Sequence, residues 1–455
     1  MRNEIPQKAL KIMSLLRSAG ARDVLIVGGF VRDTLLGIPS KDVDIEVYGM
    51  DMGEIERILM YIGNFKVDAV GKAFGVLKVD NEIDVSIPRR ESKIGVGHRD
   101  FKIDPDPNMS VEDAASRRDF TINSMAMRED GTIIDPFNGI KDLNEFVLRA
   151  TSGAFAEDAL RVLRAMQFAS RFGGFMSHET AELCKHMKPD FHFLPKERIW
   201  EEWKKFALKG RDASSGLTTL INTGWIEHFP ELSSMVGVPQ DPEWHPEGCV
   251  WTHTVMVVQE AINIANREQL GDEDRMVLFF AALCHDMAKP HTTKMEGGRW
   301  RAKGHCEQGV DVAESFLNRI GAPKWLVNHV KPLVMAHLVH SAGKPTDRAV
   351  RRLALRLRPS NINMLSMLIE SDHSGRSPLP KGNPFVEWVD AARRMNLAAV
   401  QPTPILRGRD LIALGMKPGR EMGPLLDKAF EAQMDGEFSN LEEAVQWVQK
   451  QSANP

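Results

Sequence analysis

The sequence predicts an α+β protein in which a small mixed α/β head precedes a long all-helical region. Strand-like apolar runs gather before residue 90, at 24–27, 43–48, 76–79 and 83–87. Helical periodicity frames the first of these runs, at 5–19 and 30–36, and it dominates from about residue 155 to the end of the sequence. This asymmetry predicts one mixed layer followed by helical domains.

Composition is that of a folded protein with several domains. The chain has 455 residues, of which 43% are apolar and 26% charged. Its longest apolar run, 276–284, is too short to cross a bilayer, so we expect no membrane partner. Four cysteines without a C-x-x-C pair suit a reducing compartment, and we expect a cytoplasmic protein. Because the net charge is −4, any nucleic-acid binding must come from local basic patches.

Two proline-rich segments break the helical region, at 238–246 and 377–384. Together with the end of the strand-like runs, they predict four parts. These are a head at 1–150, a helical neck and body at 151–240, a helical domain at 241–376, and a helical tail at 377–455.

The head contains a diglycine between a predicted strand and a predicted helix. Gly28 and Gly29 allow backbone N–H groups to approach an anion closely, and the following helix carries Arg32. A tight turn without a ligand is the alternative.

Alternating carboxylates follow in the next predicted strand. Asp42 and Asp44 are two residues apart, so both point to one face, and Asp84 on a later strand supplies a third carboxylate. Like charges this close are unfavourable unless they bind a hard divalent cation. Two Mg²⁺ ions held there would activate an attacking hydroxyl and neutralise a leaving pyrophosphate. The alternative is an exposed polar edge strand.

Several long motifs, in order, resemble the class II tRNA nucleotidyltransferase and bacterial poly(A) polymerase family. They are the segments 28–37, 41–44, 117–126, 134–139 and 157–164. The resemblance implies a nucleotidyltransferase head, a helical neck and body, and a tail. It implies an enzyme that adds C, C and A to tRNA 3′ ends from CTP and ATP, with Asp42, Asp44 and Asp84 as the catalytic carboxylates and Mg²⁺ on Asp42 and Asp44.

The same resemblance assigns roles in nucleotide binding. Arg118 would contact the phosphates of the incoming nucleotide, together with Gly28, Gly29 and Arg32. Asp119, with Asn123 near it, would sense the ribose 2′-hydroxyl and favour NTP over dNTP.

The predicted neck helix carries charged residues at helical spacing. Asp158, Arg161 and Arg164 are expected within one sector of a helix, and an exposed ion-pair face would explain that spacing equally well. The resemblance implies that Asp158 and Arg161 read the Watson–Crick edges of CTP and ATP, which a carboxylate acceptor and a guanidinium donor suit chemically. Gln167 stands where some relatives carry a third arginine.

Residues 89–108 are rich in charge, glycine and proline and are expected to form a mobile loop. Similar enzymes use such a loop to switch from C to A addition, which argues against an enzyme that adds C alone.

A second set of chemical groups lies in the helical region. His253, the adjacent pair His285 and Asp286, and Asp372 can place imidazoles and carboxylates on one divalent ion. In this order they resemble the HD phosphohydrolase superfamily. Imidazole and carboxylate ligands suit Ni²⁺, Mn²⁺ or Co²⁺ better than Mg²⁺. The resemblance implies an HD domain that acts on 2′,3′-cyclic phosphates and 2′-phosphates. Nearby candidates for a substrate phosphate or a second metal are His305, His337 and His340.

A basic stretch follows this domain. It is interpreted either as a solvated helix face or as a patch for the tRNA backbone. Its members are Lys344, Arg348, Arg351, Arg352, Arg356 and Arg358.

The sequence therefore predicts a CCA-adding tRNA nucleotidyltransferase with an HD domain, and leaves its oligomeric state open. Poly(A) polymerase or an A-only-adding enzyme of the same family are the nearest alternatives. A protein-modifying nucleotidyltransferase with an HD domain is the alternative from another class, but such regulators lack the 117–126 and 157–164 motifs. A non-catalytic RNA-binding relative would not need Asp42 and Asp44.

Overall fold

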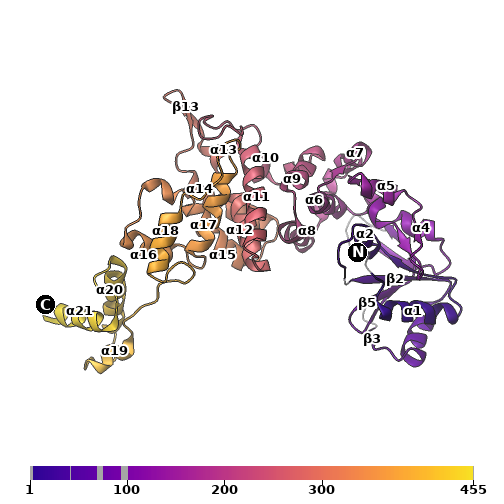
Figure 1. Cartoon of the computed structure of the whole chain (residues 1–455), viewed down its shortest axis with the longest axis horizontal. Helices are drawn as coiled ribbons and strands as arrows, with labels where there is room; N and C mark the ends of the chain where they lie inside the picture. Colours follow the sequence, from indigo (N-terminus) through magenta and orange to yellow (C-terminus); the bar gives the residue numbers. More distant parts are fainter. Residues whose placement is uncertain (1–3, 41, 69–74, 94–100, 454–455) are drawn as a thin grey trace. The chain divides into compact units, whose positions relative to one another are not determined.

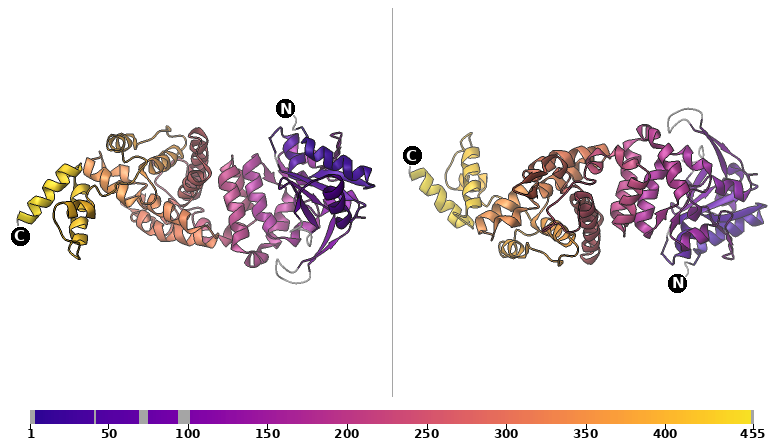
Figure 2. Two further views of the ribbon diagram at one scale, coloured as in Figure 1. Left: turned by 90° about the horizontal axis from the view of Figure 1, so that it is seen from below. Right: turned by 90° about the horizontal axis from the view of Figure 1, so that it is seen from above.

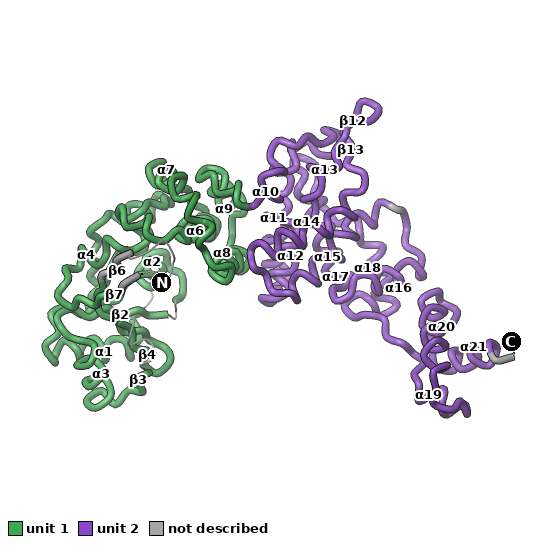
Figure 3. Tube along the Cα trace, turned by 180° about the vertical axis from the view of Figure 1, so that it is seen from behind, with its two compact units in different colours: residues 1–228 green, residues 229–455 purple. Residues whose placement is uncertain are grey.

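The computed structural model describes residues 4–40, 42–68, 75–93 and 101–453. Its contacts divide the chain into two compact units, Met1–His228 and Phe229–Pro455 (Figure 3). Each unit has its own apolar core, and each is described by itself below.

Unit 1 begins with a seven-stranded mixed sheet in the order β3-β4-β5-β2-β1-β8-β9. β2 pairs antiparallel with β1 and parallel with β5, and this parallel pair brings the ends of two strands to the same edge. The four strands predicted from apolar runs are confirmed as β1, β2, β4 and β5. The strands are β1 (Asp23–Val27), β2 (Val43–Tyr48), β3 (Val67–Asp68), β4 (Val76–Val79), β5 (Ile83–Ser86), β8 (Ala126–Met127) and β9 (Ile133–Ile134).

Short helices pack on this sheet. The first is amphipathic and buries Ala9, Ile12, Met13 and Leu16, which recur at helical spacing. Both predicted helices of this region are present, with ends shifted by one or two residues. The helices of the head are α1 (Gln7–Ser18), α2 (Gly29–Leu35), α3 (Met52–Arg57), α4 (Val111–Ser116) and α5 (Gly139–Asn144).

The expected mobile loop at 89–108 is wrong in part. Residues on both sides of its centre pair as antiparallel strands β6 (Arg89–Lys93) and β7 (Phe101–Pro105). β-Strand pairing satisfies the backbone donors and acceptors of both segments, which composition alone did not indicate. Residues 94–100 lie outside the described part of the chain.

The rest of unit 1 is helical apart from one two-stranded parallel pair, β10 (Val147–Leu148) with β11 (Phe175–Met176). α6 packs against α8 and α9, and Figures 1 and 2 show these helices grouped after the sheet. α6 ends at Gly173, whose φ of +69° is the left-handed conformation that stops a helix. The helices are α6 (Leu160–Phe172), α7 (His178–His186), α8 (Lys196–Lys209) and α9 (Ala213–Asn222).

Unit 2 is built around α12 (Asp272–Cys284), whose residues 276–284 are all buried. A helix that is apolar on every side needs neighbours on every side, and α11, α15 and α17 pack against it. The other helices are α10 (Pro230–Ser233), α11 (Val250–Arg267), α13 (Lys289–Thr292), α14 (His305–Arg319), α15 (Lys324–Ala336), α16 (Asp347–Arg356), α17 (Ile362–Ser374) and α18 (Val386–Arg394). A hairpin of β12 (Lys294–Glu296) and β13 (Arg299–Arg301) follows α13.

The end of unit 2 is a small module with its own apolar cluster, which includes Leu411, Ala429, Phe438 and Val448. It consists of α19 (Gly408–Ala413), α20 (Met422–Asp435) and α21 (Leu441–Ala453). In the described part of the chain, none of the helices is both long enough and apolar enough to span a bilayer.

Candidate functional site

Two carboxylates meet at one edge of the sheet of unit 1. In the parallel register of β2 and β5, Asp44 lies directly beside Asp84, and Asp42 immediately precedes β2. Desolvation by the surrounding protein raises the pKa of Asp44, and the negative charges of Asp84 and Asp42 raise it further against the opposing effect of Arg118. Lys78 Nζ lies 2.8 Å from Asp84 Oδ1. These carboxylates repel one another, which fits a site for a divalent cation.

Gly28 is required beside these carboxylates for two physical reasons. Its φ is +71°, a conformation that L side chains rarely adopt. A Cβ built on it would lie 3.1 Å from Arg118 Nη1 and 3.8 Å from Asp44 Oδ2. The glycine therefore leaves room between the guanidinium of Arg118 and the carboxylate of Asp44.

Arg32 is buried and fully engaged with protein groups. It donates to Asp33 Oδ1 from Nε and Nη2, at 2.8 and 2.7 Å, and to Asn123 Oδ1 from Nη1, at 2.5 Å. Its guanidinium also lies 5.2 Å from the ring centre of Phe168 and 5.0 Å from that of Phe172. These contacts anchor α2 to α6, so Arg32 holds the wall of the site in place.

Asp119 lies at the centre of the same network. Its Oδ1 accepts from Asn123 Nδ2 at 2.9 Å, and its Oδ2 accepts from Arg164 Nε at 2.8 Å. Burial alone would raise the pKa of Asp119, but Arg164 and Asn123 hold that pKa below its ordinary value. The chain of contacts from Arg32 through Asn123 and Asp119 to Arg164 joins the head to α6.

The expectation that Asp158 shares a helix with Arg161 and Arg164 is wrong. Residues Gly153–Glu157 form a 3₁₀ turn, Asp158 is extended with φ −129°, and α6 begins only at Leu160. Asp158 instead accepts from Leu160 N at 3.1 Å, at the start of the helix. A polar residue that accepts a hydrogen bond from the first turn of a helix lies before the helix, even where its spacing from later residues is helical.

Asp158 and Arg161 each have strong local partners. Arg198 of α8 approaches both oxygens of Asp158, with Nη2 2.7 Å from Oδ2 and Nη1 3.3 Å from Oδ1. Arg161 donates from Nη1 to Ala154 O and from Nη2 to Arg117 O, each at 2.8 Å. Sequence reasoning gave Arg198 no chemistry, although the charged segment 196–202 that contains it was the available signal.

A cavity of about 690 Å³ collects most of these groups. It is strongly cationic, as a site for a triphosphate requires. Asp42 is not among its lining residues. The predicted residues that line it are Gly28, Gly29, Arg32, Asp44, Asp84, Arg118, Asp119, Asn123, Asp158, Arg161 and Arg164. Lining cations that sequence reasoning missed are Arg89, Arg117, Arg171, Arg198, Lys205 and Lys209.

A second cluster of chemical groups lies in unit 2. His253 of α11, His285 and Asp286 at the end of α12, and Asp372 of α17 are all buried and converge. Asp286 Oδ2 lies 3.1 Å from His285 Nε2 and 3.6 Å from His253 Nε2. His253 Nε2 also lies 3.1 Å from Asp372 Oδ1. Residues from three segments of the chain thus form a candidate donor set for a metal ion.

The Nδ1 atoms of His253 and His285 contact protein oxygens that orient the two rings. His253 Nδ1 lies 2.7 Å from Glu247 Oε1, and His285 Nδ1 lies 2.7 Å from Ala282 O. Such contacts fix the ring so that Nε2 faces a metal. Burial lowers the pKa of His253, but Asp372 and Glu247 together raise it to about 9, so the cluster favours a positive charge. Sequence reasoning did not identify Glu247.

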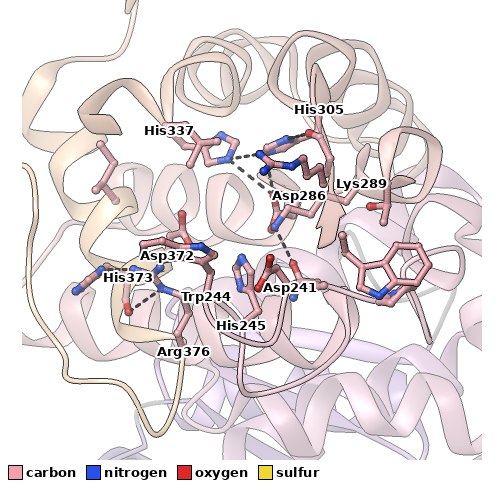
Figure 4. A pocket seen from close by; sticks show the side chains of 18 of the residues that line it. Asp241, Trp244, His245, Asp286, Lys289, His305, His337, Asp372, His373 and Arg376 are labelled. Carbon is pink, nitrogen blue, oxygen red and sulfur yellow. Dashed lines mark hydrogen bonds and ion pairs between the residues drawn. The ribbon is translucent and has the colours of Figure 1, made fainter. Parts of the chain in front are cut away.

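Two further histidines lie against the other side of Asp286 (Figure 4). His305 Nε2 is 3.4 Å and His337 Nε2 is 3.8 Å from Asp286 Oδ1. Burial lowers the pKa of His337 to about 3, so this ring is neutral near pH 7. His305, His337 and Cys306 also form a group with metal-ligand spacing. His340 lines the same pocket.

The pocket around this cluster combines aromatic and cationic side chains. Trp244, Trp300, Arg301 and Arg376 line it together with Asp286 and Lys289. Arg299 Nε lies 2.6 Å from Asp241 Oδ2, which ties strand β13 to the segment that carries Trp244. Indole rings can stack on nucleic-acid bases, and guanidinium groups can bind phosphates.

Three arginines of the basic stretch at 344–358 contact groups of another helix. Arg348 Nε lies 2.9 Å and Arg352 Nη2 lies 2.6 Å from Asp435 Oδ1, and Arg351 Nε donates to Met434 O at 3.0 Å. These arginines join α16 to the end of α20. Their partners come from a helix distant in sequence, and the interpretation of the stretch as a patch for the tRNA backbone stays a prediction.

Three protein families match successive segments of the chain. Residues 24–149 match the family "Poly A polymerase head domain", and residues 250–370 match the "HD domain" family. Between them, residues 175–236 match the family described as "Probable RNA and SrmB- binding site of polymerase A".

Two relatives that align over most of their length are both multifunctional CCA proteins. The chain is 34% identical over 425 residues to the Multifunctional CCA protein of Xanthomonas campestris pv. campestris (strain B100), covering 89% of this chain and 96% of that one. It is 33% identical over 395 residues to the Multifunctional CCA protein of Vibrio cholerae serotype O1, strain ATCC 39541, covering 83% and 93%.

Solved structures share the fold. The CCA-adding enzyme of Bacillus stearothermophilus in complex with CTP matches with a TM-score of 0.64 and 22% identity over 99% of both chains. The Thermotoga maritima CCA-adding enzyme complexed with tRNA matches with a TM-score of 0.60 and 18% identity over 99% of this chain and 97% of that one.

Proposed function

This chain belongs to the multifunctional CCA protein family, and it contains a poly(A) polymerase head domain and an HD domain. From this premise we propose that it adds C, C and A to tRNA 3′ ends from CTP and ATP. The observation that carries the proposal is the cavity of unit 1. One cavity is lined by the carboxylates Asp44 and Asp84, by the buried Asp119 with its partner Arg164, and by Asp158 and Arg161.

The carboxylates are assigned to metal binding. We place Mg²⁺ on Asp42 and Asp44, with Asp84 beside them, and two such ions would activate the tRNA 3′-hydroxyl and neutralise the pyrophosphate. Desolvation raises the pKa of Asp44 and the charges of Asp84 and Asp42 raise it further, and a bound cation would relieve this repulsion. Arg118, which approaches Glu46 Oε1 at 3.5 Å, is close enough to this edge to hold a nucleotide phosphate.

Asp158 and Arg161 are assigned to choosing the base. Cytosine and adenine both offer an exocyclic amine, which a carboxylate accepts, whereas uracil and guanine present a carbonyl at that position. Asp119 and Asn123 are assigned to the ribose 2′-hydroxyl. We further place the head in 1–150, the neck and body in 151–240, the HD domain in 241–376 and the tail in 377–455.

The activity is tested with tRNA lacking its CCA end and with labelled nucleotides supplied singly and together. The proposal predicts incorporation of CTP alone, incorporation of ATP only when CTP is present, and little use of UTP or GTP. ATP incorporation without CTP, or long A tails, would instead identify an A-only enzyme or a poly(A) polymerase. Asp44→Ala should abolish incorporation, whereas Glu129→Ala, which removes an exposed carboxylate paired with Arg17, should not.

We propose a second activity for the HD domain, the metal-dependent hydrolysis of nucleotide phosphate esters such as 2′,3′-cyclic phosphates and 2′-phosphates. The convergent imidazoles and carboxylates of His253, His285, Asp286 and Asp372 suit Ni²⁺, Mn²⁺ or Co²⁺ better than Mg²⁺. The tryptophans of the pocket supply surfaces for a base, and Trp244 is 56% exposed.

This second activity is tested with nucleoside 2′,3′-cyclic phosphates and with glycerol 1,2-cyclic phosphate, which has the same ring but no base. The proposal predicts hydrolysis of the nucleoside substrates with one of the three metals, and a higher KM for the substrate without a base. Failure to hydrolyse any of them would contradict it.

A further inference from the structure

A further acidic side chain lies on the face of β2 that carries Asp44. Glu46 follows Asp44 by two residues, so both side chains project from the same face of the strand. Glu46 also lines the cavity of unit 1, and the proposed function leaves it without a role. An additional negative charge beside a site for a triphosphate opposes anion binding, so its presence there needs a physical reason.

The carboxylate of Glu46 is fixed by a buried tyrosine. Tyr48 is 1% exposed, and its hydroxyl donates to Glu46 Oε2 at 2.5 Å. Burial raises the pKa of Tyr48, and the negative charge of Glu46 raises it further, so the phenol remains a protonated donor. The ring packs in an apolar cluster with Leu25, Val27 and Ala126, which holds the hydroxyl in place.

The other oxygen of Glu46 faces Arg118. Glu46 Oε1 lies 3.5 Å from Arg118 Nη2, and the two side chains are 13% and 25% exposed. In the described part of the chain, no other carboxylate lies within 4 Å of this guanidinium. Arg118 Nη1 lies 3.1 Å from the position that a Cβ would occupy on Gly28. The guanidinium thus contacts Glu46 with one nitrogen and lies beside the diglycine turn with another.

These contacts order a long cationic side chain before a nucleotide arrives. A free arginine side chain samples many rotamers, and ordering it on binding lowers affinity. A guanidinium has five N–H donors, so the contact of Arg118 Nη2 with Glu46 leaves donors for phosphate oxygens. A donor that is already ordered binds its ligand more tightly, because the loss of rotamer freedom precedes binding.

We propose that Glu46 is a positioning residue for nucleotide binding. With Tyr48 fixing its carboxylate, Glu46 holds Arg118 in the orientation that meets the phosphates of the incoming nucleotide. This inference rests on the proposal above that Arg118 contacts these phosphates. Because the charge of Glu46 is paired with the guanidinium that it orients, the carboxylate contributes direction to the site and its effect is on binding.

The test separates nucleotide affinity from the chemical step. Addition of C to tRNA lacking its CCA end is measured over a range of CTP concentrations for the full chain and its variants. Glu46→Ala should raise the KM for CTP by roughly tenfold with little change in kcat, because Arg118 loses its orientation in the ground state and the transition state alike. Tyr48→Phe, which removes only the hydroxyl, should raise the KM by less. Tyr61→Phe is the matched control, since Tyr61 is 80% exposed, and it should leave the KM unchanged.

A double-mutant cycle shows whether Glu46 acts through Arg118. Once Arg118→Ala has removed the guanidinium, adding Glu46→Ala should cause no further rise in the KM. An equal rise in both backgrounds, or an unchanged KM in both Glu46→Ala and Tyr48→Phe, would overturn the inference. A loss of kcat that additional Mg²⁺ restores would also overturn it, since Glu46 would then be a metal ligand.

The cycle remains decisive if Glu46→Ala fails to fold. Tyr48→Phe, alone and combined with Arg118→Ala, then gives the same comparison with a smaller expected rise in the KM. A wild-type chain that adds no nucleotide would contradict the proposed function. Wild-type activity with an unchanged KM in the folded variants would overturn this inference alone.

Discussion

The carboxylate of Asp158 is held by the guanidinium of Arg198, which reaches it from α8 with Nη2 2.7 Å from Oδ2 and Nη1 3.3 Å from Oδ1. A fork of this kind fixes the plane of the carboxylate. The direction in which Asp158 offers its oxygens to a base is therefore set by a residue outside the motif that contains it.

Arg198→Ala should relax the choice of base without removing catalysis. Asp158 then loses its positioning partner, and we expect the preference for CTP and ATP over UTP and GTP to fall by roughly tenfold or more. Single-nucleotide incorporation with each NTP measures the change. Lys204→Ala is the matched control, since Lys204 lies on the same helix and pairs with the exposed Glu201. Unchanged selectivity in both Arg198→Ala and Asp158→Ala would exclude this role.

Gly28→Ala should lower nucleotide incorporation by more than its effect on stability explains. Alanine at φ +71° costs about 1 kcal/mol, and its Cβ would crowd Arg118 Nη1 at 3.1 Å. Gly131→Ala is a control with similar strain, because φ is +84° there and a Cβ would meet nothing within 4 Å. Denaturation should show similar losses for both variants, and only Gly28→Ala should lose incorporation. Equal activity of the two variants would argue against the proposed role of this turn.

The two proposed activities should be separable. His285→Ala with Asp286→Ala removes both metal-binding groups at the end of α12, and we expect loss of 2′,3′-cyclic phosphodiesterase activity. Incorporation of CTP and ATP should remain largely unchanged, because the residues assigned to it all lie in unit 1. Parallel assays of both reactions on one preparation provide the measurement. Parallel loss of both activities in a folded variant would show that they depend on one centre.

The C-terminal module should loosen when the ion pairs on α16 are reversed. Asp435→Arg places a cation against Arg348 and Arg352, which approach Asp435 Oδ1 at 2.9 and 2.6 Å. We expect faster hydrogen exchange in α20 and an effect that shrinks with added salt. Combining Asp435→Arg with Arg352→Asp should restore part of the protection. Exchange that does not change would mean that apolar contacts alone hold the module.

The sequence predicted the elements that depend on local pattern. The apolar run at 24–27 became β1, where all four residues are buried, and the alternating run at 43–48 became β2, where Val43, Ile45 and Val47 are buried. Gly28 was identified because the step from β1 into α2 needs a backbone conformation that glycine adopts readily. His285 and Asp286 were identifiable because they directly follow the longest apolar run of the sequence, 276–284.

What could not be predicted depends on contacts between distant segments. The spacing of Asp158, Arg161 and Arg164 suggested one helix, but the 3₁₀ turn before Asp158 ends with this residue outside α6. Arg198 acquires its role from Asp158, 40 residues away, and the charged segment that contains Arg198 did not indicate this partner. Glu247 lies close to His253 in sequence, but it belongs to no motif that the sequence analysis used. The pairing of Arg348 and Arg352 of α16 with Asp435 could not be predicted, because Asp435 is remote in sequence.

The central claim is tested most directly by sequencing the 3′ ends that the purified chain makes on tRNA lacking CCA, with CTP and ATP both present and Mg²⁺ supplied. The account predicts that most products end in CCA and stop there, and that Asp44→Ala makes none. Products that end in a single A, extend into an A tail, or appear equally with Asp44→Ala would contradict it.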